Sequence, residues 1–276
     1  MVAVSCLPCS YSKAWSPSDD ANLHAWYNQT GLGDTGDDQT TWQDQSGNNL
    51  NLAESGSVNP TISTALINGL KGVAFGPDSG MTRLAFMDID GQDFLFAVVF
   101  QDTNVNDFEN TIVVIDLDAP TSGYGLFQFN YSTFLRTVTI GQDSGTVSVN
   151  SGNGYDEFYG SSGVHGGGVV WTLHRKGNTV TSTVNGISLN SFTEELSSTG
   201  NDAVHLGSYS GASNESQTTV NYETVVMLGD SIPDSTRIAV EGYLAYKFAK
   251  HDRLKTLANT DNHKYKKAQP WGVGRS

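Results

Sequence analysis

The chain has 276 residues, enough for one large domain with a substantial core or for two small ones. Only 16% of the residues are charged, below the usual ~25%, and 30 of the 276 residues are glycine, above the usual ~7%. This composition favours many short strands joined by tight turns. No apolar run approaches the ~20 residues of a membrane span. The N-terminus lacks the basic and apolar regions of a secretory signal, so we expect a soluble protein made in a cytoplasm.

The charge is divided unevenly along the chain. Residues 1–236 contain 6 Lys+Arg against 26 Asp+Glu, a balance of −20, whereas residues 237–276 contain 9 against 3, a balance of +6. An acidic body repels nucleic acid and anionic membranes, so neither is an expected partner. The basic end suits an acidic surface, either on this chain or on a neighbour.

The two cysteines, Cys6 and Cys9, lie in the sequence CLPC. This spacing occurs in redox sites, in half of a zinc site and in disulfides. A zinc site needs four ligands, and the chain has no second cysteine pair. Free thiols, a disulfide and a bound metal all remain open.

Strand-like segments follow one another through most of the chain, separated by Gly, Asn, Asp and Ser clusters, as in an antiparallel sandwich. The predicted strands are 23–27, 72–75, 93–101, 111–116, 125–131, 134–140, 145–149, 168–175, 178–184, 203–209 and 219–228. In 178–184, Val180, Ser182 and Val184 alternate with threonines, so one face should be buried. Asn185-Gly186 then predicts a type I′ hairpin turn with positive φ at both residues.

A single helix is predicted within residues 230–249, DSIPDSTRIAVEGYLAYKFA. Ser231 suits the N-cap and Asp234 the reciprocal capping position. At 100° per residue, the apolar face comprises Ile238, Leu244, Ala245, Phe248 and Ala249. Glu241 falls in the middle of this face, where a lone carboxylate is costly to bury. We interpret Glu241 as a structural anchor between the helix and the sandwich; a catalytic acid is the alternative.

No internal repeat or linker divides the chain, so we predict one domain. The sandwich and its terminal helix should occupy residues 21–250, with an N-terminal arm at 1–20 and a basic C-terminal arm at 251–276.

Two blocks of the sequence resemble the concanavalin A-like (LamG-type jelly-roll) superfamily. The first comprises LHAWYNQTGLG (23–33), TTWQDQSGNNLNL (40–52) and INGLKGVAFGPD (67–78), and the second is the segment 222–254 with its EGYLAYKF helix. HKYKKAQP (263–270) is similar to the tail of the same subgroup, although Phe248 and Lys264 replace an expected Trp and Pro. The resemblance implies an all-β fold, an antiparallel concanavalin A-like jelly-roll sandwich with one short C-terminal α-helix. It also implies a setting, because this subgroup is frequent in phage structural proteins and in surface proteins of marine bacteria, but no particular ligand.

The block around Trp42 is interpreted as a structural turn. Asp44 and Asn48 can bond local backbone N–H groups, and Gly47 can adopt left-handed geometry.

Catalytic patterns known on this fold are missing from the sequence. Glucanases of this fold carry an E-x-D-x-x-E motif or a variant one residue shorter, alginate lyases carry Gln-x-His, and serine hydrolases of other folds carry G-x-S-x-G; this chain has none of them. We therefore expect a protein that is not an enzyme.

Calcium is a possible cofactor, since relatives on this fold often bind it through loop carboxylates. Two acidic loops could supply oxygen ligands, one with Asp34, Asp37 and Asp38 and the other with Asp88, Asp90 and Asp93. The same residues are also ordinary turn formers.

Two surface segments are candidate binding regions. The loop GYDEFYGSSGVHGGG offers aromatic rings for stacking on sugars and carboxylates for their hydroxyl groups; its candidates are Tyr155, Asp156, Glu157, Phe158, Tyr159 and His165. Equally, this loop could pack on the sandwich. The basic tail is a candidate interface with Trp271 as apolar anchor; its candidates are Lys264, Tyr265, Lys266, Lys267, Trp271 and Arg275.

Together these patterns predict a non-enzymatic phage virion structural protein, a capsid decoration or tail-appendage subunit with a lectin-like fold that could contact glycans. Its partners would be other virion proteins or identical subunits, and surface glycans are a further candidate. The alternatives are a carbohydrate-binding module or adhesin on a cell surface and, less favoured, a glycan-cleaving enzyme.

Overall fold

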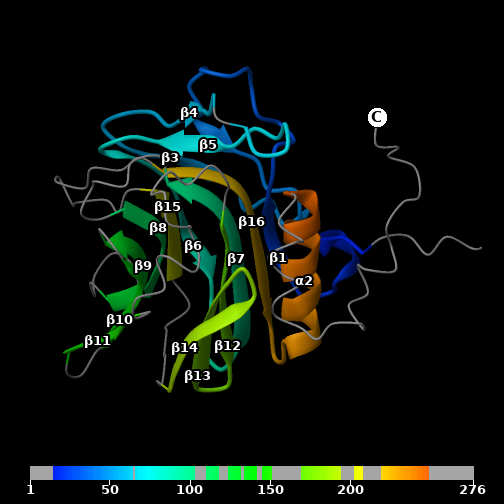
Figure 1. Ribbon diagram of the computed structural model, residues 1–276, viewed down its shortest axis with the longest axis vertical. Helices are drawn as coiled ribbons and strands as arrows, with labels where there is room; N and C mark the ends of the chain where they lie inside the picture. Colours follow the sequence, from blue (N-terminus) through cyan, green and yellow to red (C-terminus); the bar gives the residue numbers. More distant parts are fainter. Residues whose placement is uncertain are drawn as a thin grey trace, which may run out of the picture.

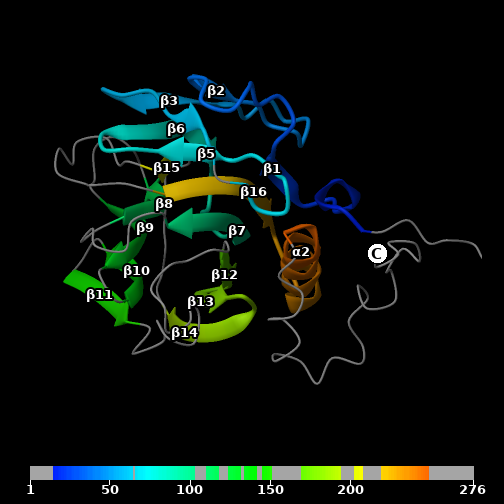
Figure 2. The ribbon, with the colours of Figure 1, turned by 45° about the horizontal axis from the view of Figure 1, so that its top comes forward.

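The computed structural model describes residues 15–64, 66–102, 110–117, 124–131, 134–141, 145–150, 169–193, 202–207 and 219–248. Two eight-stranded antiparallel sheets make up most of this part of the chain (Figures 1 and 2). The prediction of an all-β antiparallel sandwich with one C-terminal α-helix is confirmed. None of the helices in these residues is long and apolar enough to cross a membrane.

The first sheet, here called sheet A, has the order β14-β13-β12-β7-β16-β5-β4, and β1 also pairs with β16. Strands β5 and β1 share one edge of β16, pairing with its first and second halves respectively. The strands of sheet A are β1 (Leu23–Tyr27), β4 (Thr61–Ile62), β5 (Val73–Phe75), β7 (Asp93–Asp102), β12 (Val169–Lys176), β13 (Thr179–Val184), β14 (Ile187–Thr193) and β16 (Thr219–Gly229).

The second sheet, sheet B, has the order β11-β10-β9-β8-β15-β6-β3-β2. All of its neighbouring strands are antiparallel. Its strands are β2 (Thr41–Trp42), β3 (Leu52–Gly56), β6 (Ser79–Met87), β8 (Asn110–Leu117), β9 (Tyr124–Tyr131), β10 (Phe134–Gly141), β11 (Gly145–Asn150) and β15 (Asp202–Gly207).

Each of the eleven predicted strand segments overlaps a strand of the structure. Of the five other strands, β14 was implied only by the predicted hairpin turn before it. The sequence did not indicate β2, β3, β4 and β6. Two of them have only two residues, too few for a periodic pattern to emerge. In β6, Arg83 interrupts the apolar run and Ala85 has a left-handed φ of 48°, so the alternation of a regular strand is lost.

The β13–β14 hairpin turns at Asn185-Gly186, whose φ angles are 48° and 74°. These are the left-handed values that a type I′ turn requires. Val180 is fully buried, whereas the side chain of Val184 lies outside the described part of the structure.

Strand β7 is buried on both faces and organises the core. Phe94, Phe96, Val98 and Phe100 point into the cluster between the two sheets. The alternate residues 95, 97 and 99 join a second cluster on the outer face of sheet A. This two-sided burial explains the continuous apolar run FLFAVVF, because a strand covered on both faces has no polar side.

Helix α2 (Asp234–Lys247) covers the outer face of sheet A beside β16 and β7 (Figure 1). Leu244 and Phe248 are buried in the second cluster, as predicted. The predicted inward position of Ile238 is wrong, since its side chain is 41% exposed. At 100° per residue, Ile238 lies roughly 120° around the helix from Leu244, which places it beyond the edge of the buried face.

The start of α2 also differs from the prediction. The helix begins at Asp234, its N-cap is Pro233, and no side chain caps it. Ser231 lies one residue before buried Ile232 and is exposed, so it is not the capping residue. Pro233 precedes the helix because its fixed φ suits a first turn and it has no N–H to satisfy.

The described N-terminal part begins at Trp15 and passes through a 3-10 helix, η1 (Pro17–Asp19). Trp15 packs edge-on against Tyr243 of α2 with ring centroids 6.1 Å apart. The predicted domain boundaries stay predictions, because most of both arms lies outside the described residues.

Candidate functional site

The predicted binding residues fall outside the described parts of the chain. These are the glycan-binding candidates Tyr155, Asp156, Glu157, Phe158, Tyr159 and His165, the interface candidates Lys264, Tyr265, Lys266, Lys267, Trp271 and Arg275, and the cysteines Cys6 and Cys9. Their roles remain predictions.

Asp44 is the centre of the turn that follows β2. Its Oδ1 accepts the backbone N–H groups of Trp26 and Ser46 at 2.9 and 2.8 Å, and its Oδ2 accepts the N–H of Leu50 at 3.0 Å. Gly47 has a φ of 96°. This carboxylate therefore holds the turn against β1 through local backbone donors.

Two other residues of this block connect the turn to the chain in different ways. The buried Trp42 donates its indole N–H to the carbonyl of Asn28 at 2.8 Å. Asn48, expected to accept backbone N–H groups, instead donates its amide to the carbonyls of Leu23 and His24 at 3.2 and 2.9 Å. The edge of β1 leaves these carbonyls facing the turn, so a donor is required there.

The first acidic loop does not gather its carboxylates around one point. Asp37 accepts the backbone N–H of Asp34, and Asp38 accepts the amide of Asn59 at 3.2 Å. Asp34 lies 3.6 Å from the ammonium group of Lys71. These are the contacts of an ordinary turn.

The second acidic loop, residues 88–93, is fixed by protein groups. Arg175, which is buried, donates to the carbonyl of Ile89 at 2.6 Å, and Asp202 accepts the Ile89 N–H at 3.1 Å. Asp93 accepts the N–H groups of Gly177 and Ile232 at 2.7 and 3.1 Å. Within the described residues, no group of three His, Cys, Asp or Glu side chains could hold a metal ion.

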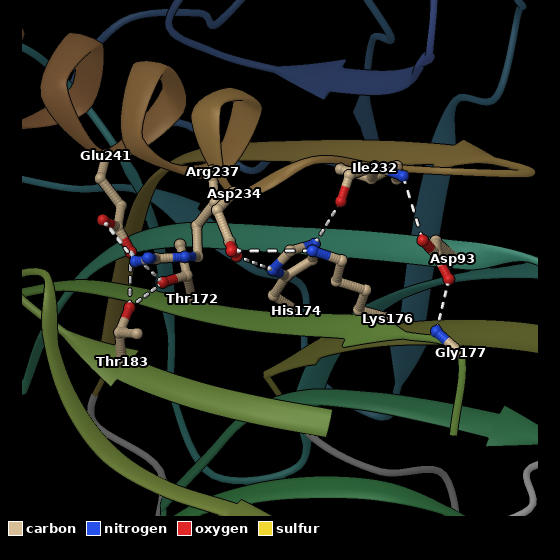
Figure 3. Close-up of polar contacts among 10 residues, drawn as sticks. All are labelled: Asp93, Thr172, His174, Lys176, Gly177, Thr183, Ile232, Asp234, Arg237 and Glu241. Carbon is tan, nitrogen blue, oxygen red and sulfur yellow. Dashed lines mark hydrogen bonds and ion pairs between the residues drawn. The ribbon is translucent and has the colours of Figure 1, made fainter. Parts of the chain in front are cut away.

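Glu241 connects α2 to the sheet beneath it (Figure 3). Its Oε1 accepts the hydroxyl groups of Thr172 at 2.7 Å and Thr183 at 2.6 Å, from adjacent strands β12 and β13. Arg237, one turn earlier, donates to both carboxylate oxygens at 3.0 Å. The carboxylate is only 5% exposed, so these charge-assisted bonds replace the water that it loses on burial.

A second set of polar contacts fixes the entrance to the helix (Figure 3). The ring of His174 contacts the Ile232 carbonyl through Nε2 at 2.9 Å, and its Nδ1 lies 3.6 Å from Asp234. Lys176 is 3.7 Å from the other oxygen of Asp234. Burial lowers the pKa of His174, while the Ile232 carbonyl and Asp234 act in the opposite direction.

A second carboxylate beneath the helix, that of Glu223, was not singled out from the sequence. Glu223 is fully buried in β16. It accepts the indole N–H of Trp26 at 2.7 Å and the hydroxyl of Tyr243 at 3.0 Å, and it pairs with Lys247. Burial raises the pKa of Glu223, and Lys247 and the two neutral donors lower it. The only sequence signal was a single acid inside an apolar strand.

The polar layer, defined here as Glu223, Glu241, His174, Asp93 and their partners, serves to attach α2 to sheet A. The sheet contributes Glu223 to a cation on the helix, and the helix contributes Glu241 to hydroxyls on the sheet. Each of these carboxylates already contacts two or more donors, as expected for groups that hold a structure together.

We expect Glu241→Ala to lower the melting temperature by about 5–10 °C without altering any binding activity. The change leaves two buried hydroxyls and Arg237 without their acceptor, at a cost of about 2–3 kcal/mol, and a domain of this size loses about 2–4 °C per kcal/mol. Thermal unfolding followed by circular dichroism measures the effect. Glu54→Ala, at an exposed position of β3, is the matched control, and an unchanged midpoint for Glu241→Ala contradicts the anchoring role.

Comparison with known proteins shows similarity of fold without similarity of sequence. No protein-family model matches the chain, and no curated protein matches it. Many solved structures do match.

Three solved structures illustrate the similarity. The binding domain of Paraclostridial Mosquitocidal Protein 1 has a TM-score of 0.54 at 13% identity, over 84% of this chain and 53% of that one. The botulinum neurotoxin serotype D ligand-binding domain, solved with N-acetylneuraminic acid, has a TM-score of 0.55 at 12% identity, over 81% and 52%. A Trypanosoma rangeli sialidase has a TM-score of 0.53 at 13% identity, over 89% and 36%.

The chain spans about half the length of the two binding domains that it matches. At these identities the similarity concerns the fold alone. What the binding domains and this chain share is a β-rich fold.

Proposed function

We propose that this chain is a non-enzymatic binding module of lectin fold that recognises surface glycans as a subunit of a phage virion. The observation that carries the glycan proposal is the likeness of fold, over 81–84% of this chain, to the binding domains of a mosquitocidal protein and a botulinum neurotoxin. One of those domains was solved with N-acetylneuraminic acid, so a sialylated glycan is the first ligand to test.

The non-enzymatic part of the proposal is supported by the chemistry of the described carboxylates. Glu223 and Glu241 are enclosed beneath α2 and contact cationic or hydroxyl partners. A general acid or nucleophile must reach a substrate, and these two groups face the sheet–helix interface. The sialidase match covers only 36% of that chain, which leaves most of the enzyme outside the similarity.

The virion part of the proposal is supported by the sequence. The segments 23–78 and 222–254 resemble a subgroup frequent in phage structural proteins. Residues 1–236 have a net charge of −20, and residues 237–276 have a net charge of +6. The basic tail therefore suits an acidic surface on an adjacent subunit. Its location would be the virion, after synthesis in the host cytoplasm, and its partners would be virion proteins or identical subunits.

We expect the full chain to bind sialylated probes on a glycan array, and Tyr155→Ala combined with Tyr159→Ala to weaken that binding about tenfold. Two lost stacking contacts of about 0.5–1.5 kcal/mol each account for such a change. Titration calorimetry with the strongest probe measures it. Val58→Ala with Leu84→Ala, at exposed apolar positions elsewhere, is the control pair. The glycan proposal fails if the array shows no binding or if both pairs bind alike.

We also expect the protein to be found by mass spectrometry in purified virions, and truncation after Lys250 to reduce its incorporation. The basic tail should act through charge, so raising salt from 0.1 to 1 M should weaken the full chain's assembly as the Debye length falls from ~10 to ~3 Å. Incorporation of the truncated chain at the level of the full chain would show that the tail is not an interface.

A further inference from the structure

Two hairpin turns in the described part of the chain contain the same pair of residues. Asn68-Gly69 joins Ile67 to Leu70, whose backbones exchange hydrogen bonds of 3.3 and 2.9 Å, and Asn185-Gly186 joins β13 to β14. The φ angles are 52° and 74° in the first turn and 48° and 74° in the second. The first pair lies between Ile and Leu and the second between Val and Ile. The two turns are therefore matched in local sequence and in backbone conformation.

An asparagine followed by glycine can lose its side-chain amide without an enzyme. The backbone nitrogen of the glycine attacks Cγ of the asparagine, the bond from Cγ to the amide nitrogen breaks, and ammonia leaves with the proton of the attacking N–H. Water then opens the cyclic imide at either carbonyl, giving aspartate or isoaspartate. Glycine favours the attack because it has no side chain to hinder a close approach. The reaction requires a side chain that can turn toward the next peptide and water that can reach the imide.

Asn185 meets neither requirement. It is 4% exposed, and its Oδ1 accepts the N–H of Val170 in β12 at 3.0 Å. Its own N–H donates to the Val170 carbonyl at 2.6 Å, so the residue continues the pairing of β13 with β12. Turning its side chain toward Gly186 would take this acceptor away from the buried N–H of Val170, which is costly.

Asn68 meets both requirements. Asn68 and Gly69 are exposed, and a Cβ added to Gly69 would meet nothing within 4 Å, so the space around the attacking residue is open. The side-chain amide of Asn68 donates to the carbonyl of Lys247 at 2.8 Å. Because this bond lies at the surface, water can replace it when the side chain turns.

The same bond gives the modification a structural consequence. Lys247 is the last residue of α2, and its carbonyl is one of the four that a helix leaves without an internal partner. Deamidation would exchange the donor at this carbonyl for a carboxylate, at the negative end of the helix dipole. The isoaspartate product would also lengthen the backbone of a turn whose Ile67 belongs to the same apolar cluster as Phe248.

We propose that Asn68-Gly69 is a site of spontaneous deamidation, and that its conversion releases the C-terminal end of α2 from the turn 67–70. Asn185-Gly186 is protected from the same reaction by its burial and by its bonds to Val170. This site is independent of the glycan and virion proposals, because it depends only on the two turns and their contacts.

Ageing of the purified full chain in mildly alkaline buffer tests the site, with peptide mass spectrometry measuring the conversion of each amide to an acid. In the folded protein, Asn68 should convert at least about tenfold faster than Asn185, because breaking one buried hydrogen bond first slows a reaction by about that factor. In concentrated urea the two should convert at similar rates, since their neighbours in the sequence are alike. Equal rates in the folded protein, or an Asn68 that stays intact there while it converts in urea, overturn the proposal.

Asn68→Asp reproduces one product and tests the structural consequence. Its melting temperature should fall by about 3–6 °C, because the variant loses the donor to Lys247 and places an anion at the end of the helix. Asn49→Asp is the matched control, at an exposed asparagine with a similar φ of 57° in the turn after β2, and should shift the midpoint by less than about 2 °C. Equal shifts in the two variants contradict the release of α2.

Discussion

Lys247→Met is expected to reduce the free energy of unfolding by about 3–5 kcal/mol at pH 7. Lys247 pairs with Glu223, whose carboxylate is 0% exposed. Removing one member of a buried ion pair leaves an uncompensated charge, which is among the most destabilising single changes. Methionine keeps much of the length of the lysine chain but lacks the ammonium group, which lies 5.4 and 5.8 Å from the ring centroids of Tyr243 and Phe248.

The same variant should show a distinctive dependence on pH. Burial already raises the pKa of Glu223, and Lys247 is the largest influence that lowers it. Without Lys247, the folded-state pKa rises further above the unfolded value of about 4.3. The folded state then binds more protons than the unfolded state, so stability is fully present below the unfolded pKa and is lost as pH rises through the folded pKa.

Urea unfolding at pH 4 and pH 7 measures both effects. The difference between the parent and Lys247→Met should be large at pH 7 and should shrink toward pH 4. Adding Glu223→Gln to Lys247→Met should recover much of the loss, because an amide oxygen can still accept from Trp26 and Tyr243. The explanation fails if Lys247→Met loses the same unfolding free energy at both pH values. It also fails if adding Glu223→Gln restores none of that loss, because Glu223 would then not be the unpaired buried charge that destabilises the variant.

The architecture could be predicted because it is encoded by local patterns. The alternation of polar and apolar residues in β13 predicts a strand with one buried face. The short continuous apolar run of β7 predicts a strand that is buried on both faces. Asn185-Gly186 marks a hairpin because few residue pairs adopt two left-handed conformations in succession. These signals depend on neighbours in the sequence.

The polar layer could be predicted only in part, because its partners are distant in the sequence. Glu241 stood out because it interrupts the apolar face of one helix. Glu223 did not, since its partner Lys247 is 24 residues away and Trp26 is 197 residues away. Likewise, Asp93 was assigned to a possible calcium loop, and its actual partners come from two other segments.

The sequence also did not determine which side chains of α2 face solvent. A helical projection identifies an apolar face, but it assumes that charges turn outward. Here Arg237 and Glu241 satisfy each other beneath the helix, which leaves Ile238 on the outside. Tertiary pairing therefore reversed the expected side for that residue.

Gly207→Ala is expected to destabilise the protein by about 2–5 kcal/mol. Gly207 ends β15 in sheet B with a φ of +78°, and an added Cβ would lie 2.5 Å from the ring of Phe75 in sheet A. The left-handed backbone costs about 1–2 kcal/mol with a side chain, and overpacking adds about 1–3 kcal/mol. A glycine within a strand pattern often marks such a close approach, and here the aromatic ring of one sheet rests on the backbone of the other.

Gly69→Ala separates the two costs. Gly69 has nearly the same φ, +74°, but an added Cβ would meet nothing within 4 Å, so only the backbone cost of about 1–2 kcal/mol should appear. Phe75→Leu, combined with Gly207→Ala, should cost less than the two single changes added together, because the smaller side chain relieves the collision. Denaturant unfolding of the four variants measures these free energies. If Gly207→Ala costs no more than Gly69→Ala, or if the double variant is strictly additive, the two sheets do not meet at Phe75 as closely as the structure indicates.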